Sequence, residues 1–426
     1  MLYKKLLILT LCIIAFGKWN FYAQNYPDYI PFHKGDKWGF CDSSKAIRIN
    51  PRYESADFFN HGHARVSLNN HWGFIDSVGN EHWLPDSVSF LSYNDEFIMV
   101  SNGKKNTLMD HDFNLLKFYV YDAVLEFDHG LAPVRIGERW GYIDKTGREV
   151  VPIFYGPGYH GKFVEGLTWQ MMNGKSGYLD TTGKIAIPFE YELASPFING
   201  YAQVRKNNKW IVINKHGKEF DSLNYDYTGP FYDGLSAVKM GNKTGFIDTL
   251  GKLVIPLDYD NTGFFHEGFA AVMIKNKWGY INKENKVVIN AKYDHAGDFQ
   301  DGFANVQKGD DWILINRQGK KVSSGEFDYI IKVDKDLYII KTKGISGVMD
   351  NNGQKVVPMK YNYIFYINNG MFIASIKGKS GIMDRTGKVI VPFIYDSLEV
   401  QQQGLFYAKR DGKFGYLDLS GKEYWE

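Results

Sequence analysis

Cysteine is almost missing from this chain, which has only Cys12 and Cys41 in 426 residues. If Cys12 is removed with a leader segment, the remaining cysteine has no partner for an internal disulfide. A dominant sign of charge is missing too, because 50 Lys and Arg stand against 48 Asp and Glu. A nearly neutral chain has no electrostatic footprint for nucleic acid or an anionic membrane. We therefore expect stability from packing alone and no nucleic acid partner.

Long apolar runs are also missing, with one short exception at the N-terminus. Lys4 and Lys5 precede an apolar stretch from Leu6 to Gly17, which is too short to span a bilayer as a helix. This pattern predicts a signal peptide over residues 1–23. No later segment is apolar for eighteen residues. We therefore expect no integral membrane segment in the mature chain.

The end of the leader allows two interpretations. Ala23 followed by Gln24 is a plausible cleavage point, and cleavage there leaves 47 basic against 48 acidic side chains. A lipid anchor on Cys12 is the alternative, but the segment Leu9-Thr10-Leu11-Cys12 has a large leucine where a small residue is normally required. We favour cleavage near Ala23 and export of residues 24–426.

Catalytic signatures are lacking as well. The chain has no nucleophile-elbow, zinc-protease, P-loop or dinucleotide-binding motif. Carboxylates do occur in pairs, but no pair is singled out as the two acids of a glycosidase. These pairs are Asp95-Glu96, Glu126/Asp128, Asp310-Asp311 and Asp334/Asp336. We expect no enzyme activity, no catalytic residue and no cofactor.

The chain has instead a 34-residue period that recurs twelve times, as in solenoids, propellers and other repeat arrays. Every interval between anchor positions is 34 residues, except the 36 from Trp140 to Ser176. The anchors are Trp38, Trp72, Asn106, Trp140, Ser176, Trp210, Thr244, Trp278, Trp312, Ser346, Ser380 and Phe414. The first unit begins near residue 35, and the last unit is truncated.

Within each unit the pattern predicts short strands and tight turns. Apolar residues alternate with period two, as in Ala304/Val306, and a recurrent proline twelve residues past the anchor opposes a helix. An Asp-x-x-Gly turn closes the first strand, as in 144–147, with Asp or Asn in first place in all twelve units. In two units, Ile211 and Ile313 replace the glycine after the anchor. Because isoleucine rarely adopts a positive φ, this position needs no special backbone conformation, and we expect the glycine to make room for a neighbouring residue.

These positions resemble the WG-repeat family, named for the Trp-Gly pair. The matching elements are Trp-Gly-Tyr/Phe-Ile-Asp, the turn glycine, Ile-Pro, the tyrosine fifteen residues past the anchor, and Phe-x-x-Gly-x-Ala-x-Val. The resemblance covers the chain from about Gly35 onward, and the Asn106 unit departs most from it. It implies a bacterial protein, often exported to the periplasm, the surface or the medium, without an established catalytic residue.

The fold class follows from the strands and the period. We expect an all-β, open, twisted solenoid-like array of repeats with a continuous aromatic-rich core. The alternative is closure into a propeller-like ring. The open form is preferred because 34 residues are few for a four-stranded blade and twelve units are many for one ring.

Three features bear on a site. The repeated aromatics are interpreted as core rather than as a ligand platform. A metal site is conceivable but not favoured in the early histidines, which are His33, His61, His63, His71 and His82. Two extra residues fall within 156–161, where an insertion marks either a tolerated loop or a binding face.

We therefore predict a secreted or surface scaffold that binds an unidentified protein or glycan without catalysis. The alternative is a carbohydrate-active enzyme that uses one degenerate repeat. A binder spreads unusual residues along a face, whereas an enzyme concentrates polar outliers in one concavity. The sequence assigns no ligand-binding or metal-binding residue.

Overall fold

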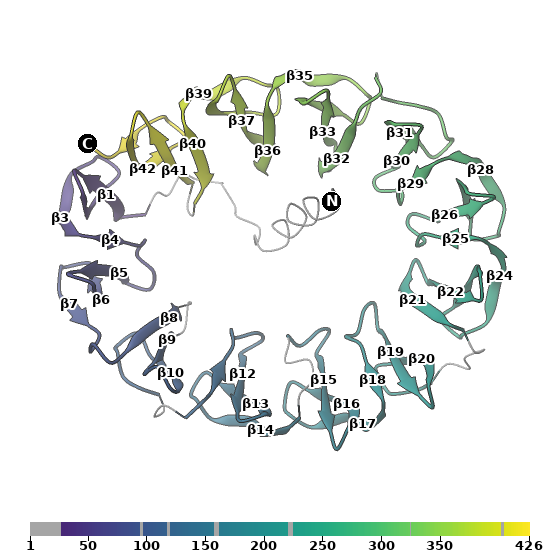
Figure 1. Cartoon of the computed structure of the whole chain (residues 1–426), viewed down its shortest axis with the longest axis horizontal. Coiled ribbons are helices and arrows are strands. Elements are labelled where there is room, and N and C mark those ends of the chain that lie inside the picture. Colours follow the sequence, from purple (N-terminus) through teal and green to yellow (C-terminus); the bar gives the residue numbers. More distant parts are fainter. Residues whose placement is uncertain are drawn as a thin grey trace. The chain divides into compact units, whose positions relative to one another are not determined.

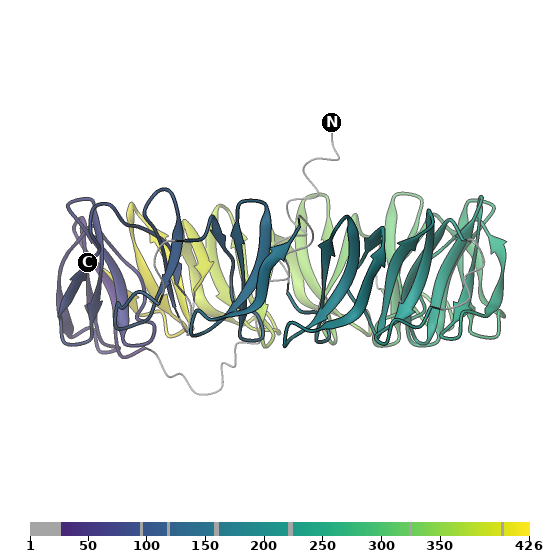
Figure 2. The same cartoon turned by 90° about the horizontal axis from the view of Figure 1, so that it is seen from below.

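The computed structural model describes residues 27–93, 97–116, 120–156, 162–219, 225–323, 325–401 and 404–426. The predicted signal peptide, Cys12 and the cleavage point lie outside these residues, as do 157–161 of the predicted insertion. The described residues form antiparallel sheets of three or four strands, each drawn as an up-and-down meander in Figures 1 and 2. The all-β repeat fold is therefore confirmed. Contacts divide the chain into two units, unit 1 (residues 1–83, 331–350 and 354–426) and unit 2 (residues 84–330 and 351–353).

Unit 1 holds the sheets from both ends of the chain, together with most of the sheet that begins at β32. Its strands are β1 (Ile30–Lys34), β2 (Lys37–Cys41), β3 (Ile47–Tyr53), β4 (Ser55–Ala56), β5 (His63–Leu68), β6 (His71–Asp76), β7 (Glu81–Trp83), β32 (Tyr329–Asp334), β33 (Leu337–Thr342), β34 (Ile345–Asp350), β35 (Lys355–Tyr361), β36 (Tyr363–Asn368), β37 (Met371–Ile376), β38 (Lys379–Met383), β39 (Val389–Tyr395), β40 (Ser397–Val400), β41 (Leu405–Arg410), β42 (Lys413–Asp418) and β43 (Glu423–Tyr424).

Unit 2 holds the sheets between them. Its strands are β8 (Ser89–Tyr93), β9 (Ile98–Ser101), β10 (Asn106–Met109), β11 (Ala123–Val124), β12 (Leu131–Ile136), β13 (Arg139–Asp144), β14 (Glu149–Tyr155), β15 (Leu167–Met172), β16 (Lys175–Asp180), β17 (Ile185–Tyr191), β18 (Leu193–Ala194), β19 (Tyr201–Lys206), β20 (Lys209–Asn214), β21 (Tyr227–Tyr232), β22 (Leu235–Met240), β23 (Lys243–Asp248), β24 (Leu253–Tyr259), β25 (Asn261–Thr262), β26 (Phe269–Ile274), β27 (Lys277–Asn282), β28 (Val287–Tyr293), β29 (His295–Ala296), β30 (Phe303–Lys308) and β31 (Asp311–Asn316).

The sheet β25–β28 shows how a repeat folds. The Trp-Gly strand β27 pairs with β26 on one side and with β28 on the other. Three of the four strands match the predicted ones. The short strand β25 was not predicted, because two residues such as Asn261 and Thr262 are too few to show an alternating pattern.

The glycine after the anchor makes room for a bulge in the outer strand. Trp278 pairs with Tyr293 but Tyr280 pairs with Ile289, so β28 contributes two extra residues opposite Gly279. A Cβ atom on Gly279 would lie 2.4 Å from the Ile289 carbonyl oxygen. The sequence-based interpretation of this glycine is confirmed.

Units without this glycine fold differently. Thr107, Ile211 and Ile313 stand in its place, and their sheets are β8–β10, β18–β20 and β29–β31. Within the described residues, none of these three sheets has the outer strand that follows the Trp-Gly strand in the other nine. A side chain at this position therefore coincides with loss of the bulged strand.

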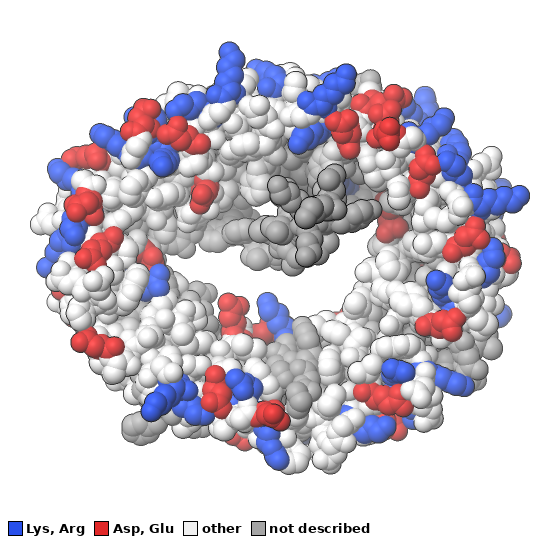
Figure 3. All heavy atoms as spheres, viewed as in Figure 1, with Lys and Arg blue, Asp and Glu red and all other residues white. Residues whose placement is uncertain are grey.

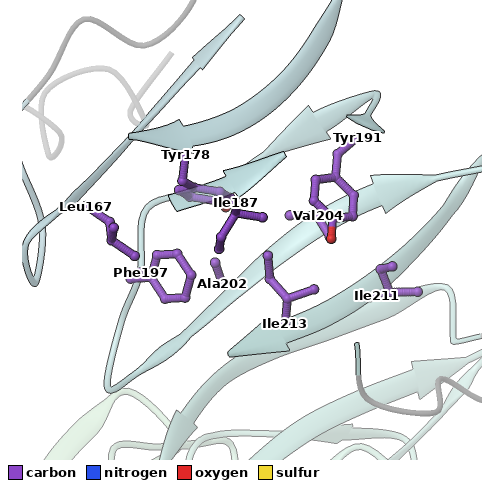
Figure 4. Close-up of a cluster of buried hydrophobic side chains, with 9 residues drawn as sticks. All are labelled: Leu167, Tyr178, Ile187, Tyr191, Phe197, Ala202, Val204, Ile211 and Ile213. Atoms are coloured by element: carbon purple, nitrogen blue, oxygen red, sulfur yellow. The ribbon is translucent and has the colours of Figure 1, made fainter. Parts of the chain in front are cut away.

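The apolar core lies between consecutive sheets. In one interface, Tyr178, Ile187 and Tyr191 of β16 and β17 face Phe197, Val204 and Ile213 of the next sheet (Figure 4). The aromatic residues two and fifteen positions past the anchors are buried. The anchor ring is only half-buried, and in unit 1 Trp72 is 39% exposed. The predicted aromatic core is thus confirmed for the tyrosines and phenylalanines, whereas anchor tryptophans such as Trp38 and Trp278 are only partly buried against it.

In unit 1 the first and last repeats pack on each other. His33 of β1 forms a parallel bridge with Trp425, and the Glu426 backbone N–H donates to the His33 carbonyl over 3.0 Å. Ile30 and Phe32 share an apolar cluster with Leu405, Tyr416 and Tyr424. The preferred open array leaves its terminal repeats apart and is wrong on this point. The propeller-like alternative, in which the ends meet, describes the observed contact.

Phe58 completes this contact by taking the role that a phenylalanine at another repeat position has in other interfaces. In other interfaces a phenylalanine from the next sheet meets the buried ring edge-on, as Phe299 does against Tyr280 at 4.8 Å between centroids. At the terminal contact, Phe58 meets Tyr416 in the same manner at 4.7 Å. The adjacent Phe59 meets Phe40 at 4.9 Å, so the two rings serve two different interfaces.

Candidate binding surface on the loops of unit 2

The early histidines do not gather into one group. His63 and His71 begin the paired strands β5 and β6, but His63 lies opposite Asp76 and His71 lies opposite Leu68, at the other end of the hairpin. The ring centroids of His63 and His82 lie 6.3 Å apart. His61 is exposed in the preceding turn, and His33 is buried beside Trp38 and Phe414. Among the described residues, no three His, Cys, Asp or Glu side chains are grouped as a metal site requires.

Three carboxylates of the predicted pairs take part in hydrogen bonds or ion pairs. The backbone N–H of Phe163 donates to Asp128 over 3.0 Å. Asp334 accepts the Tyr366 hydroxyl over 2.6 Å, and Asp336 pairs with Arg385 at 2.5 Å. Asp310 and Asp311 lie at the turn into β31, and Asp95-Glu96 lies outside the described residues. These bonds assign Asp128, Asp334 and Asp336 to holding loops and sheets together.

The interface beside the insertion is polar, but it is buried. Thr168 and Gln170 stand where other repeats have Ala and Val, and both are fully buried. The Gln170 amide donates to the Tyr142 hydroxyl over 2.9 Å, and Thr168 lies 3.3 Å from the same oxygen. These polar side chains bond to one another inside the core, so this cluster offers no surface to a ligand.

Acidic residues at two repeat positions connect neighbouring sheets, and the sequence analysis missed both. Asp294, next to the buried Tyr293, accepts the Gly309 backbone N–H over 2.8 Å and pairs with Lys277 of the preceding sheet. At the loop before β26, Glu267 accepts the Gly302 backbone N–H and pairs with Arg317, both over 2.8 Å. The recurrent acid after the tyrosine was the signal that could have identified the first set.

A cluster of half-exposed side chains on the loops between β21 and β30 does not follow the repeat. Tyr232 ends β21, Phe264 and His266 lie between β25 and β26, and Asp298 lies between β29 and β30. The Tyr232 ring lies 4.6 Å from His266 and 5.2 Å from Phe264, measured between centroids. His266 Nε2 lies 3.6 Å from Asp298 Oδ2. We call these four residues the Tyr232–Asp298 cluster.

Glycines bring the loops of successive sheets together at this cluster. A Cβ atom on Gly229 would lie 3.2 Å from the Phe264 ring, and one on Gly263 would lie 2.9 Å from the Asp298 carboxyl. Each loop therefore covers the backbone of the preceding sheet. This close approach holds the side chains of three consecutive sheets within contact of one another.

The members of the cluster differ from the residues at the same positions in the adjacent units. The position of Phe264 and Asp298 in the repeat is occupied by Pro196 and Pro230 in the two units before them. The position of Tyr232 and His266 is occupied by Ile198 and by Gln300. The core of the fold therefore does not require these side chains. Comparing surface positions across the aligned repeats was the signal that could have identified them.

Burial raises the pKa of Asp298 above its ordinary value, although nearby His266 and a hydrogen bond from the Phe264 backbone lower it. Its carboxylate side chain is 27% exposed. In the part of the chain that the structure describes, no Lys or Arg pairs with it. The cluster thus combines aromatic rings with a carboxylate that is poorly neutralised.

The charges elsewhere on the surface are mixed. On the face shown in Figure 3, basic and acidic side chains lie beside one another. Ion pairs between neighbouring sheets account for part of this mixing, among them Lys243–Asp260 and Lys379–Asp396. This distribution agrees with the near-neutral composition. In addition, the described residues include no helix with the length and hydropathy needed to cross a membrane.

The fold and its repeated Trp-Gly strand define an all-β repeat protein. A family model described as WG containing repeat matches ten segments of the sequence, and the chain belongs to this family. The matched segments are 38–72, 108–140, 140–175, 177–210, 212–243, 245–278, 278–312, 314–344, 347–379 and 381–414. The predicted resemblance is confirmed. No curated protein matches the sequence.

The solved structures that match the chain have low sequence identity and low TM-scores. A eukaryotic initiation factor shares 10% identity, with 85% of this chain and 95% of that chain covered and a TM-score of 0.37. The extracellular domain of a one-component system from B. thetaiotaomicron shares 9% identity, with coverage of 93% and 75% and a TM-score of 0.25. PorZ, a surface component of the type-IX secretion system of Porphyromonas gingivalis, shares 10% identity, with coverage of 91% and 65% and a TM-score of 0.22.

Proposed function

We propose that this WG-repeat protein is an exported, non-catalytic scaffold that binds a protein or glycan partner through the Tyr232–Asp298 cluster. The observation that carries the proposal is that four adjacent, half-exposed side chains depart from the repeat on three consecutive sheets. Side chains that the core does not need and that lie together on loops are candidates for recognition.

The composition of the cluster supports binding. Aromatic rings supply a large contact area with few rotatable bonds, and a carboxylate supplies direction and specificity. The loops that carry them are held to their neighbours by bonds such as Glu267 to Gly302 and Arg317. The surface is thus preformed, which lowers the entropy lost when a partner binds.

The carboxylates support a non-catalytic role. A glycosidase needs two carboxyl groups across one sugar, about 5–10 Å apart. Asp298 has His266 rather than a second carboxylate beside it in the cluster, and Asp128, Asp334 and Asp336 hold structural bonds. Export rests on the predicted signal peptide over residues 1–23, and cleavage is tested by sequencing the mature N-terminus.

The test compares the mature protein with a variant that carries Tyr232→Ala, His266→Ala and Asp298→Asn. Both are applied to a glycan array and used to capture proteins from the surface fraction of the native organism. We expect one defined glycan or protein to be retained by the parent and lost by the triple variant. Gln300→Ala is the matched control, because Gln300 occupies the position of His266 one sheet further along and is exposed.

Two results would overturn the proposal. Equal retention of the same partner by the parent and the triple variant would place recognition elsewhere on the chain. Release of reducing ends from an arrayed glycan by the parent protein would favour the carbohydrate-active enzyme instead. Circular dichroism of each variant confirms that the fold is retained.

A further inference from the structure

Asp298 differs from Glu165 and Glu267, two other acidic residues on loops of unit 2. Glu165 pairs with Lys215 at 2.9 Å, and Glu267 pairs with Arg317 at 2.8 Å. Among the basic side chains that the structure describes, only His266 pairs with Asp298, at 3.6 Å. The repeat thus provides a Lys or Arg partner for Glu165 and Glu267 and none for Asp298.

The surroundings of Asp298 favour a positive charge. The faces of Tyr and Phe rings attract cations, and this attraction is strongest where water is partly excluded. Tyr232 and Phe264 lie side by side on the preceding loops, and both are half-buried. A half-buried carboxylate next to these rings has lost part of its hydration without gaining a fixed cation.

We propose that the Tyr232–Asp298 cluster binds the ammonium or guanidinium group of a lysine or arginine side chain presented by a partner protein. This inference rests on the proposed function and specifies its ligand chemistry. The cation lies against the rings of Tyr232 and Phe264 and pairs with the carboxylate of Asp298. The His266 ring borders the site.

Charge complementarity separates this ligand from a neutral sugar. A sugar hydroxyl donates a hydrogen bond to the carboxylate but leaves its charge uncompensated, whereas a cation compensates it at contact distance. A purely apolar group would bury the carboxylate further without any partner, which is unfavourable. The cluster is therefore better matched to a basic side chain than to either alternative.

The site also predicts a pH dependence. The titratable groups that face Asp298 are His266 and Tyr280, and the Tyr280 hydroxyl donates to the Gly297 carbonyl over 2.7 Å. Protonation of Asp298 removes the anionic partner, so binding weakens as the pH falls. Because burial raises the pKa of Asp298, the loss begins at a higher pH than for an exposed aspartate.

Saturation-transfer NMR on the intact mature protein tests the inference, since it detects weak ligands directly. The probes are the N-acetyl methylamides of lysine, arginine and norleucine, together with cellobiose. We expect transfer to the lysine and arginine probes at neutral pH and none to norleucine or cellobiose. Asp298→Asn should weaken binding of both basic probes roughly tenfold or more. Asp301→Asn is the control, because it removes a carboxylate of the same loop and keeps the cluster.

Each other outcome contradicts the inference. Equal transfer in the parent and in Asp298→Asn means that the basic probes bind elsewhere. Equal transfer to norleucine means that the rings recognise apolar groups, and transfer to cellobiose alone assigns the cluster to a sugar. If the triple variant loses its captured partner while the basic probes fail to bind, the ligand chemistry is wrong but the proposed function holds. If neither effect occurs, both are wrong.

Discussion

At the residue scale, the depth of each aromatic side chain decides its contribution to stability. Tyr280 is fully buried between sheets, whereas its neighbour Trp278 is half-buried against the same cluster. Tyr280→Ala should therefore lower the free energy of unfolding by about 3–5 kcal/mol, and Trp278→Ala by clearly less. Chemical denaturation of the two variants measures the difference. A larger effect for Trp278→Ala would show that the anchor ring belongs to the core after all.

Gly279 provides a second test at this scale. Because a Cβ atom would lie 2.4 Å from the Ile289 carbonyl oxygen and 2.6 Å from the Ala291 backbone nitrogen, the outer strand has to shift to admit even alanine. We expect Gly279→Ala to cost about 1–3 kcal/mol, the usual range for overpacking. Hydrogen exchange should show faster exchange confined to β28. Unchanged protection of β28 would mean that the bulge adapts without strain.

The residues of the proposed binding site could be predicted from the sequence only in part. The repeat pattern identifies what the fold needs, and it correctly assigned the role of Gly279 and the burial of Tyr280. Tyr232, Phe264, His266 and Asp298 were missed because they are departures from the pattern on three different repeats. Only the contact between loops of successive sheets makes them one cluster, and that contact is tertiary.

At the scale of elements, the Asp-x-x-Gly turn is the best-predicted feature. In the turn after β13, Asp144 accepts hydrogen bonds from Thr146 N–H and Oγ1 and from the Arg148 backbone N–H, at 2.6–3.1 Å. Gly147 follows with a φ of 76°. The hydroxyl of Thr146 makes the largest contribution to lowering the pKa of Asp144, to about 2. Burial opposes this shift, and backbone N–H groups add to it.

Substitution of Asp144 tests the turn. Asn214 and Asn316 make the same two backbone contacts in other repeats, so Asp144→Asn should be tolerated. Asp144→Ala removes the acceptor and should cost about 1 kcal/mol or more. Because the pKa of Asp144 is lower in the folded state, its ionised form adds stability above pH ~4, the value for an unfolded chain. That stability should be lost as the pH falls toward 2.

The measurement is the urea midpoint of the parent, Asp144→Asn and Asp144→Ala between pH 2 and pH 7. The parent should lose its advantage over Asp144→Ala on acidification, and the difference at pH 7 should be the largest. A difference that does not change with pH would mean that the charge of Asp144 has no role in the turn.

At the scale of the whole molecule, the sequence predicted the number and the type of repeats but not how the ends are connected. The period is a property of each repeat, so it shows in the sequence. The terminal contact depends on residues that are almost 400 positions apart, such as Phe32 and Tyr424. Phe58 packs against Tyr416 as Phe299 packs against Tyr280. The neighbouring sequence does not indicate this role, because a second phenylalanine beside Phe59 also suits a loop.

The contact between the first and last repeats is the central claim about this fold, and one distance tests it. Lys34 Nζ lies 2.7 Å from Glu426 Oε2. Spin labels are placed at Lys34→Cys and Glu426→Cys in a chain in which Cys12 and Cys41 are both replaced by serine, so that no other thiol is labelled. Pulsed dipolar spectroscopy should then give a single short distance between labels that are in neighbouring strands. Twelve sheets stacked in an open array at about 10 Å each would separate the labels by about 100 Å. The absence of a short distance would contradict the contact.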